Sequence, residues 1–145
     1  MSVGHLARRF ATSISSMPPP PADVEWAQQW LSAAERELWE QMAAADRRHS
    51  IAVARRFAAL RPDAPAAEMA GALLHDAGKV EAGLGTFARV VATVVGPRTR
   101  RFRLYHDHEA IGARLADDAG SDPVTVALIE GRGPAAADLR AADEV

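Results

Sequence analysis

The sequence lacks several features that would place it in well-known classes. It contains no cysteine, which excludes disulfides and thiolate metal sites, so any metal site must use His, Asp or Glu. Its net charge of −2 is not the strongly basic balance of a general nucleic-acid-binding protein. No apolar run reaches the roughly 18 residues of a membrane-spanning helix, and no unbroken apolar stretch near the start resembles a secretory signal. We therefore expect a cytoplasmic protein with no transmembrane segment.

The sequence also has no stretch of alternating polar and apolar residues long enough to indicate a β-strand. Alanine, the strongest helix former, is abundant instead. The chain is 145 residues long, which is enough for one domain with its own apolar core. The sequence predicts an all-α fold, an irregular single-domain helical bundle.

Local signals divide the chain into three parts. Residues 1–17 are basic and carry apolar residues at helical spacing, which predicts an amphipathic helix. This helix either docks on the domain or makes a weak contact with a membrane surface or a partner. Residues 18–22 are a Pro-rich spacer, and residues 23–145 are expected to form the helical domain.

Several residues mark the expected helix ends within the domain. Ser32 and Glu35 have the spacing of a capping box. Thr86 and Asp107 are candidate N-caps, and Gly78 is placed to end the helix before it. The expected helices are 22–30, one opened by the capping box, 46–60, 65–77, 86–95, 108–119, 124–130 and a last helix that reaches the end of the chain.

Helical phase places three of the five histidines on inward faces. His49 shares a face with Val53, and His108 shares one with Ile111. His75 ends an apolar run, "GALLH". A single inward histidine is more often a hydrogen-bonded core residue than a metal ligand. Three from different helices favour a metal site, because histidine is the commonest metal-binding side chain.

Two aspartates extend this candidate cluster. Asp76 directly follows His75, and buried carboxylates are rarely left unpaired. Asp143 lies four residues after Leu139 and shares its inward face, although the pattern alone favours a frayed, solvated acid at so late a position. Gly71, one turn before His75, is expected to leave room for the imidazole. His106 is expected to lie outside the helix that starts at His108.

Four segments in this order resemble the HD-domain metal-dependent phosphohydrolase superfamily, most closely the small HD-domain proteins of actinobacteria. The segments are "RRHSIAVARRF", "GALLHDAGK", "HEAIGARLADDAGSDP" and "LRAADEV", and the resemblance covers nearly the whole chain. It implies that one divalent metal ion is bound by His49, His75, Asp76 and Asp143. It also implies that His108 binds a second metal ion or faces the substrate.

The sequence departs from this family at one place. Many relatives carry one or two histidines after the segment that corresponds to "VALI", where this chain has Gly131 and Arg132. The linker from there to Asp143 is also short. These differences leave open whether a second metal ion binds and where the last ligand lies.

The candidate ligands form a mixed nitrogen–oxygen set that suits Mn²⁺, Fe²⁺, Co²⁺, Ni²⁺ or Zn²⁺. Asp76 could also accept a proton from an attacking water molecule. Lys79 either contacts a substrate phosphate, as the resemblance implies, or is a cation near a helix C-terminus. Arg48 either holds phosphate or is solvated. The basic run "RTRRFR" is either a solvated surface or attracts an anionic substrate.

Three hypotheses of different classes follow. The leading one is a divalent-metal phosphohydrolase that acts on a phosphate ester, such as a nucleotide, with Asp76 and Lys79 as catalytic residues. Lys79, Arg48 and His108 would bind this phosphorylated substrate. The alternative is a degenerate HD protein that binds a nucleotide or a protein partner without turnover. The third is a helical scaffold whose residues 1–17 meet a partner or a membrane.

Overall fold

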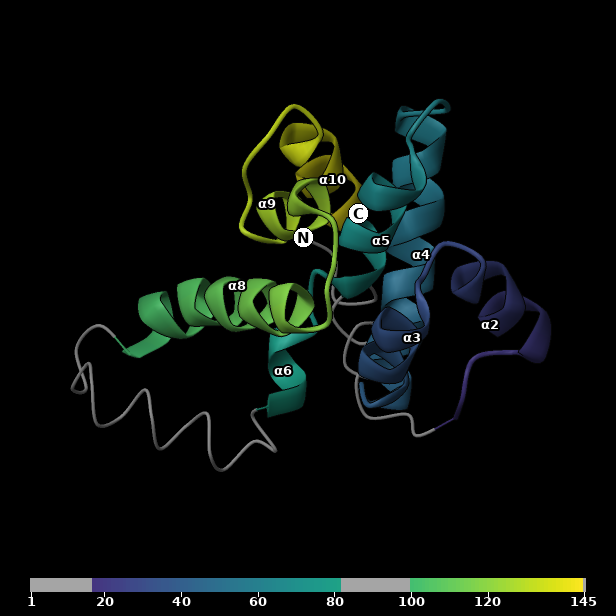
Figure 1. Ribbon diagram of the computed structural model, residues 1–145, viewed down its shortest axis with the longest axis horizontal. Helices are drawn as coiled ribbons and strands as arrows, with labels where there is room; N and C mark the ends of the chain where they lie inside the picture. Colours follow the sequence, from purple (N-terminus) through teal and green to yellow (C-terminus); the bar gives the residue numbers. More distant parts are fainter. Residues whose placement is uncertain (1–16, 82–99, 145) are drawn as a thin grey trace, which may run out of the picture.

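The computed structural model describes residues 17–81 and 100–144, and within these ranges the chain is helical without any strand. This confirms the expected all-α fold (Figure 1). The helices are α2 (Pro21–Gln28), α3 (Ala33–Glu40), α4 (Ala44–Leu60), α5 (Ala66–Leu74), α6 (Gly78–Glu81), α8 (Arg100–Asp118), α9 (Pro123–Ile129) and α10 (Ala136–Asp143).

The N-terminal helices follow their sequence signals closely. Pro21 occupies the first turn of α2, where a missing N–H costs nothing, so the end of the Pro-rich spacer is helical. The capping box is present, because Ser32 N–H donates to Glu35 Oε1 at 2.8 Å and Glu35 N–H donates to Ser32 Oγ at 3.2 Å. The buried indole N–H of Trp39 donates to Ser50 Oγ at 2.9 Å, which ties α3 to α4.

Helix α5 lies at the centre of the fold (Figure 1). It packs against α4 on one side and α9 on another, while α10 packs on α4, and α8 packs on both α9 and α6. Seven consecutive residues of α5, from Glu68 to Leu74, are buried. A helix that is apolar almost all round is expected at the centre of a bundle. The site described below lies where α5 ends, between α4 and α10.

Helix α8 begins eight residues earlier than the sequence predicted. It starts at Arg100 rather than His108, so Asp107 lies inside the helix and does not cap it. His106, expected outside, is also within α8. The segment from Arg100 to Asp107 contains neither glycine nor proline, so nothing in it stops a helix, and the cap-forming tendency of Asp107 is overridden.

The two glycines near the histidine–aspartate pair serve interhelical packing. Helix α5 already ends at Leu74, and Gly78 begins α6 rather than ending the helix before it. A Cβ at Gly78 would overlap the carbonyl oxygen of His108, and a Cβ at Gly71 would lie 2.8 Å from Leu128 Cδ2. The space beside Gly71 is therefore filled by α9, and the expectation that it accommodates the imidazole was wrong.

Two expected helices lie outside the described residues. These are the amphipathic segment, of which only Met17 is described, and the helix expected from Thr86 to residue 95. Among the helices that the structure describes, none is both long enough and apolar enough to cross a membrane.

Candidate metal centre

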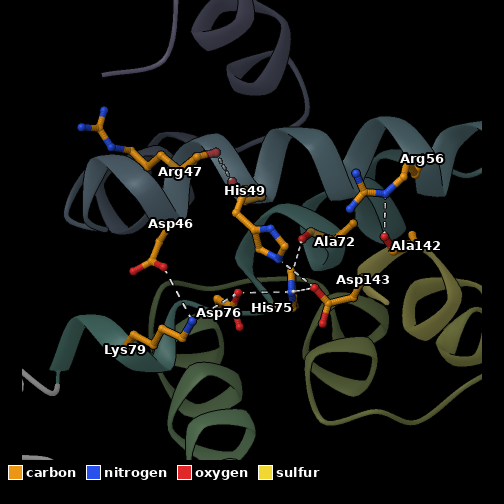
Figure 2. A network of polar contacts seen from close by, with 11 residues as sticks. Asp46, Arg47, His49, Arg56, Ala72, His75, Asp76, Lys79, Ala142 and Asp143 are labelled. Atoms are coloured by element: carbon orange, nitrogen blue, oxygen red, sulfur yellow. Dashed lines mark hydrogen bonds and ion pairs between the residues drawn. The ribbon is translucent and has the colours of Figure 1, made fainter. Parts of the chain in front are cut away.

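Three helices bring two imidazoles and a carboxylate together at one point. His49 comes from α4, His75 follows the end of α5, and Asp143 is the last residue of α10. One ligand atom from each lies within 4.8 Å of the others, and Figure 2 shows the three side chains converging. Residues that are 94 positions apart in the sequence thus form one cluster, in which His49 Nε2 donates to Asp143 Oδ1 at 2.8 Å.

The imidazole of His75 is oriented as in a metal-binding histidine. Its Nδ1 lies 2.7 Å from the carbonyl oxygen of Ala72, which can only accept, so Nδ1 carries a hydrogen. The buried Nε2 makes no hydrogen bond with any residue that the structure describes but lies 3.4 Å from both Asp76 Oδ2 and Asp143 Oδ1. In the neutral imidazole its lone pair therefore faces two carboxylates. Such a place requires a cation, either a proton or a metal ion.

One hydrogen bond and the packing of α10 hold Asp143 in place. Arg56 Nε donates to the carbonyl oxygen of Ala142 at 2.7 Å, as Figure 2 shows. Leu139 and Ala142 are buried on the same face of α10. Asp143 is therefore an inward residue held by packing and a hydrogen bond, and the alternative of a frayed acid is wrong.

The charges in the cluster shift the pKa values of its members. The imidazoles of His49 and then His75 lower the pKa of Asp143 far below its usual value, although partial burial opposes this. Burial lowers the pKa of His75, but the adjacent carboxylates of Asp143 and Asp76 outweigh burial and raise it to about 9. Without a metal ion, His75 is thus protonated at neutral pH, and its proton occupies the place that a metal ion would take.

Asp76 and Lys79 lie next to this cluster rather than within it. Asp76 contacts His75 but is not part of the group whose ligand atoms all lie within 4.8 Å of one another. Lys79 Nζ lies 3.6 Å from Asp76 Oδ2 and 3.6 Å from Asp46 Oδ1. Burial lowers the pKa of Lys79, but the charges of Asp76 and Asp46 outweigh it and raise the pKa. Lys79 is therefore a cation held beside the candidate metal ligands.

The cluster forms one side of a cavity of about 380 Å³, a size in the range of small-molecule sites. His49, His75, Asp76, Lys79 and Asp143 all line it. Its remaining lining comes from α8, α9, α10 and the turn between α9 and α10, and consists of His108, Glu109, Leu128, Ile129, Gly131, Ala136, Leu139 and Arg140.

The two remaining substrate-binding candidates, His108 and Arg48, differ in their position relative to the cavity. His108 lines the cavity, whereas Arg48, adjacent to His49 in the sequence, is not among the lining residues. Helical rotation explains the difference, because neighbouring residues point about 100° apart. Of the basic run "RTRRFR", the first two residues are not described, and the rest begin α8.

Three residues of this region were missed by the sequence analysis: Asp46, Glu109 and Arg140. Asp46 lies three residues before His49, and Arg140 lies three residues before Asp143. Residues at this spacing share a helix face, so the ligand positions could have indicated both. Glu109 directly follows His108 and gave no such signal.

Gly131 lies in the cavity wall, near the position where the family that the sequence resembles is expected to carry histidines. Its φ of +80° is in the left-handed region that favours glycine. A Cβ built on it would lie 3.7 Å from Glu109 Oε2. At this position the chain thus presents backbone and a nearby carboxylate instead of an imidazole.

Comparisons with known proteins give no relative for this chain. No protein-family model, no curated protein and no solved structure matches it. The resemblance to the HD-domain superfamily therefore stays a prediction.

Proposed function

We propose that this protein is a divalent-metal-dependent phosphohydrolase that acts on a phosphate ester. The observation that carries the proposal is the arrangement of His49, His75 and Asp143, whose ligand atoms lie within 4.8 Å of one another. The buried Nε2 of His75 supports it, because this atom faces two carboxylate oxygens that cannot donate a hydrogen bond to it. The carbonyl of Ala72 supplies the outer contact that commonly orients a metal-binding histidine.

The donor set fits a divalent ion of the first transition series. Two imidazoles and one carboxylate would bind it, and Asp76, 3.4 Å from His75 Nε2, would be the fourth ligand. Mn²⁺, Fe²⁺, Co²⁺, Ni²⁺ and Zn²⁺ all suit such a mixed set. When bound, the ion would supply Lewis acidity and lower the pKa of a nearby water molecule.

The residues around the donor set have the chemistry that phosphate-ester hydrolysis needs. The carboxylate of Asp76 would accept the proton from the water that attacks phosphorus, the ester P–O bond would break, and the leaving oxygen would take up a proton from Asp76 or from solvent. Lys79, held 3.6 Å from Asp76 Oδ2, would offset negative charge on the phosphate. Both side chains line the cavity in which the substrate would lie.

Metal titration of the purified protein tests the proposal first. We expect one equivalent of a divalent ion to bind in the micromolar range or tighter. A metal-supplemented panel of nucleotides and sugar phosphates should then contain a substrate whose hydrolysis requires Asp76. The matched control is Asp117→Ala, because Asp117 is exposed on α8 and does not line the cavity.

Two results would contradict this proposal. One is the failure of the wild-type protein to bind any divalent ion. The other is an Asp76→Ala variant that hydrolyses its substrate as fast as the wild-type protein and the Asp117→Ala control.

A second candidate function is ligand binding without turnover. It is favoured by the wall at Gly131, where Glu109 lies near the position at which the family pattern has an imidazole. In this case the HD-like site would bind a nucleotide or a protein partner. Nucleotides would then raise the temperature of unfolding without any product forming, whereas turnover of any ester in the panel would rule this candidate out.

A further inference from the structure

Arg140 is a cation in the cavity wall that the proposed function does not yet use. It lies on α10, one helical turn before Asp143, and lines the same cavity as the candidate metal ligands. Its side chain is exposed, so a ligand in the cavity can reach it. Because residues three apart share a helix face, Arg140 and Asp143 lie on the same side of α10.

The two cations of the cavity differ in their partners. Lys79 lies 3.6 Å from each of two carboxylates, those of Asp46 and Asp76. For Arg140, in contrast, no hydrogen bond or ion pair of the side chain exists within the part of the chain that the structure describes. The donors of its guanidinium are therefore available to a ligand, whereas Lys79 is already engaged.

The charge balance of the cavity favours an anionic ligand once a metal ion is bound. The lining contains three carboxylates, those of Asp76, Glu109 and Asp143, and the two cations Lys79 and Arg140. A divalent ion in the cluster would make the total charge of this lining positive. Since charges inside a cavity are screened less than those on an open surface, this balance would attract a phosphate.

We infer that Arg140 binds the phosphate group of the substrate and selects phosphomonoesters over phosphodiesters. This inference rests on the proposed function. A planar guanidinium binds two oxygens of one phosphate side by side. A monoester phosphate has three non-bridging oxygens, so one remains to face the metal-binding residues. A diester has only two, and the guanidinium would occupy both.

Binding of inorganic phosphate to the Mn²⁺-loaded protein tests this inference, with dimethyl phosphate as the diester probe. Calorimetry would compare the wild-type protein with Arg140→Gln, Arg140→Lys and Arg114→Gln. Arg114 is the matched control, because it is exposed on α8 and does not line the cavity.

We expect Arg140→Gln to weaken phosphate binding about tenfold or more, the size of a lost charge-assisted bidentate contact. The phosphate affinity of Arg140→Lys should lie between those of this variant and the wild-type protein, because lysine keeps the charge but lacks the bidentate geometry of the guanidinium. Arg114→Gln should change phosphate binding less than about twofold. The wild-type protein should prefer phosphate over dimethyl phosphate, and Arg140→Gln should lose most of this preference. Mn²⁺ affinity should stay the same in all variants.

The outcomes separate this inference from the proposed function. If the wild-type protein does not bind Mn²⁺, both fail. If it binds Mn²⁺ but not phosphate, or if Arg140→Gln binds phosphate as tightly as the wild-type protein, only the role of Arg140 is overturned. An equal loss in Arg114→Gln would also overturn it, because the effect would then come from net charge alone.

Discussion

Two polar clusters join the same three helices at different places and differ in the source of their positive charge. The arginine cluster consists of Arg61 after α4, Glu68 in the first turn of α5 and Asp138 in the first turn of α10. The histidine cluster lies near the other ends of α5 and α10 and consists of His49, His75 and Asp143, with Asp76 next to it. In each place two carboxylates surround the positive group.

The arginine cluster is complete without any external group. Arg61 Nε and Nη2 donate to the two oxygens of Glu68 at 2.9 and 3.2 Å, and Arg61 Nη1 donates to Asp138 at 3.2 Å. In the histidine cluster His75 must take up a proton to satisfy the same number of carboxylates. In the arginine cluster the positive charge is therefore permanent, because the guanidinium of Arg61 does not lose its proton near neutral pH. In the histidine cluster the positive charge can come from a proton on His75 or from a metal ion that replaces this proton.

The largest effect should come from Asp143→Asn. Removing this charge takes away one of the three clustered ligands, and we expect metal affinity to fall by at least about a hundredfold, more than for a residue that only supports a ligand. Calorimetric titration with Mn²⁺ and Zn²⁺ would measure this fall. Glu144→Gln is the control, because it removes a neighbouring exposed carboxylate. Metal affinity within tenfold of the wild-type value would contradict the assignment of Asp143.

The next largest effect should be the dependence of metal affinity on pH. The pKa of His75 is raised to about 9 in the metal-free protein, so a metal ion must displace a proton at lower pH. Apparent affinity should rise about tenfold per pH unit as the pH approaches 9 and then level off. Titrations in buffers of different ionisation enthalpy would detect the released proton. An affinity that does not change between pH 6 and 9 would contradict this exchange.

The same shift should affect the stability of the metal-free protein in the opposite direction. The pKa of His75 is raised from 6.5 to about 9, so its contribution to stability is complete below the unfolded value. This contribution to stability should be lost as the pH rises from the unfolded pKa of 6.5 through the folded pKa of about 9. Thermal unfolding of the metal-free protein from pH 6 to 10 would measure this, with His75→Gln expected to show a flatter profile.

Arg61→Met should reduce stability but leave the metal site intact. The change leaves the buried carboxylate of Glu68 without its partner, which is costly. We expect the midpoint of thermal unfolding to fall by several degrees, while Mn²⁺ affinity stays within about twofold of the wild-type value. Arg114→Met is the control. If Arg61→Met weakened Mn²⁺ binding as much as Asp143→Asn, the two clusters would not be independent.

The smallest effect should come from Asp46→Asn. Asp46 is one of two carboxylates near Lys79, and the pair is partly exposed, so we expect a loss of less than about 1 kcal/mol in the free energy of unfolding. Chemical denaturation would measure this change, with the exposed Asp63→Asn as the control. A loss as large as that of Arg61→Met would show that the Asp46–Lys79 pair is structural.

The parts of the fold that were predicted correctly depend on residues that are close to one another in the sequence. The capping box of Ser32 and Glu35 formed as expected. The start of α8 was mispredicted because Asp107 has the chemistry of a cap but lies within a longer helix. A local signal gives the tendency of a residue, and packing decides whether the residue follows it.

The candidate site was predicted in part for a similar reason. Helical phase indicated that His49 and His75 point inward, because a helix fixes which residues share a face. The same phase left Asp143 open, and only the family resemblance selected it. Arg56 and Ala142, which hold α10 against α4, are 86 residues apart, and no local pattern links them.

The sequence by itself determined the helical class of this protein and indicated that His49, His75 and His108 share faces with apolar residues of their helices, because these follow from propensity and periodicity. Only the tertiary structure decided that His49, His75 and Asp143 meet, that Gly71 and Gly78 accommodate neighbouring helices, and that Arg140 enters the cavity wall. The physical reason is that such contacts join distant segments, and their geometry is set by how whole helices pack against one another.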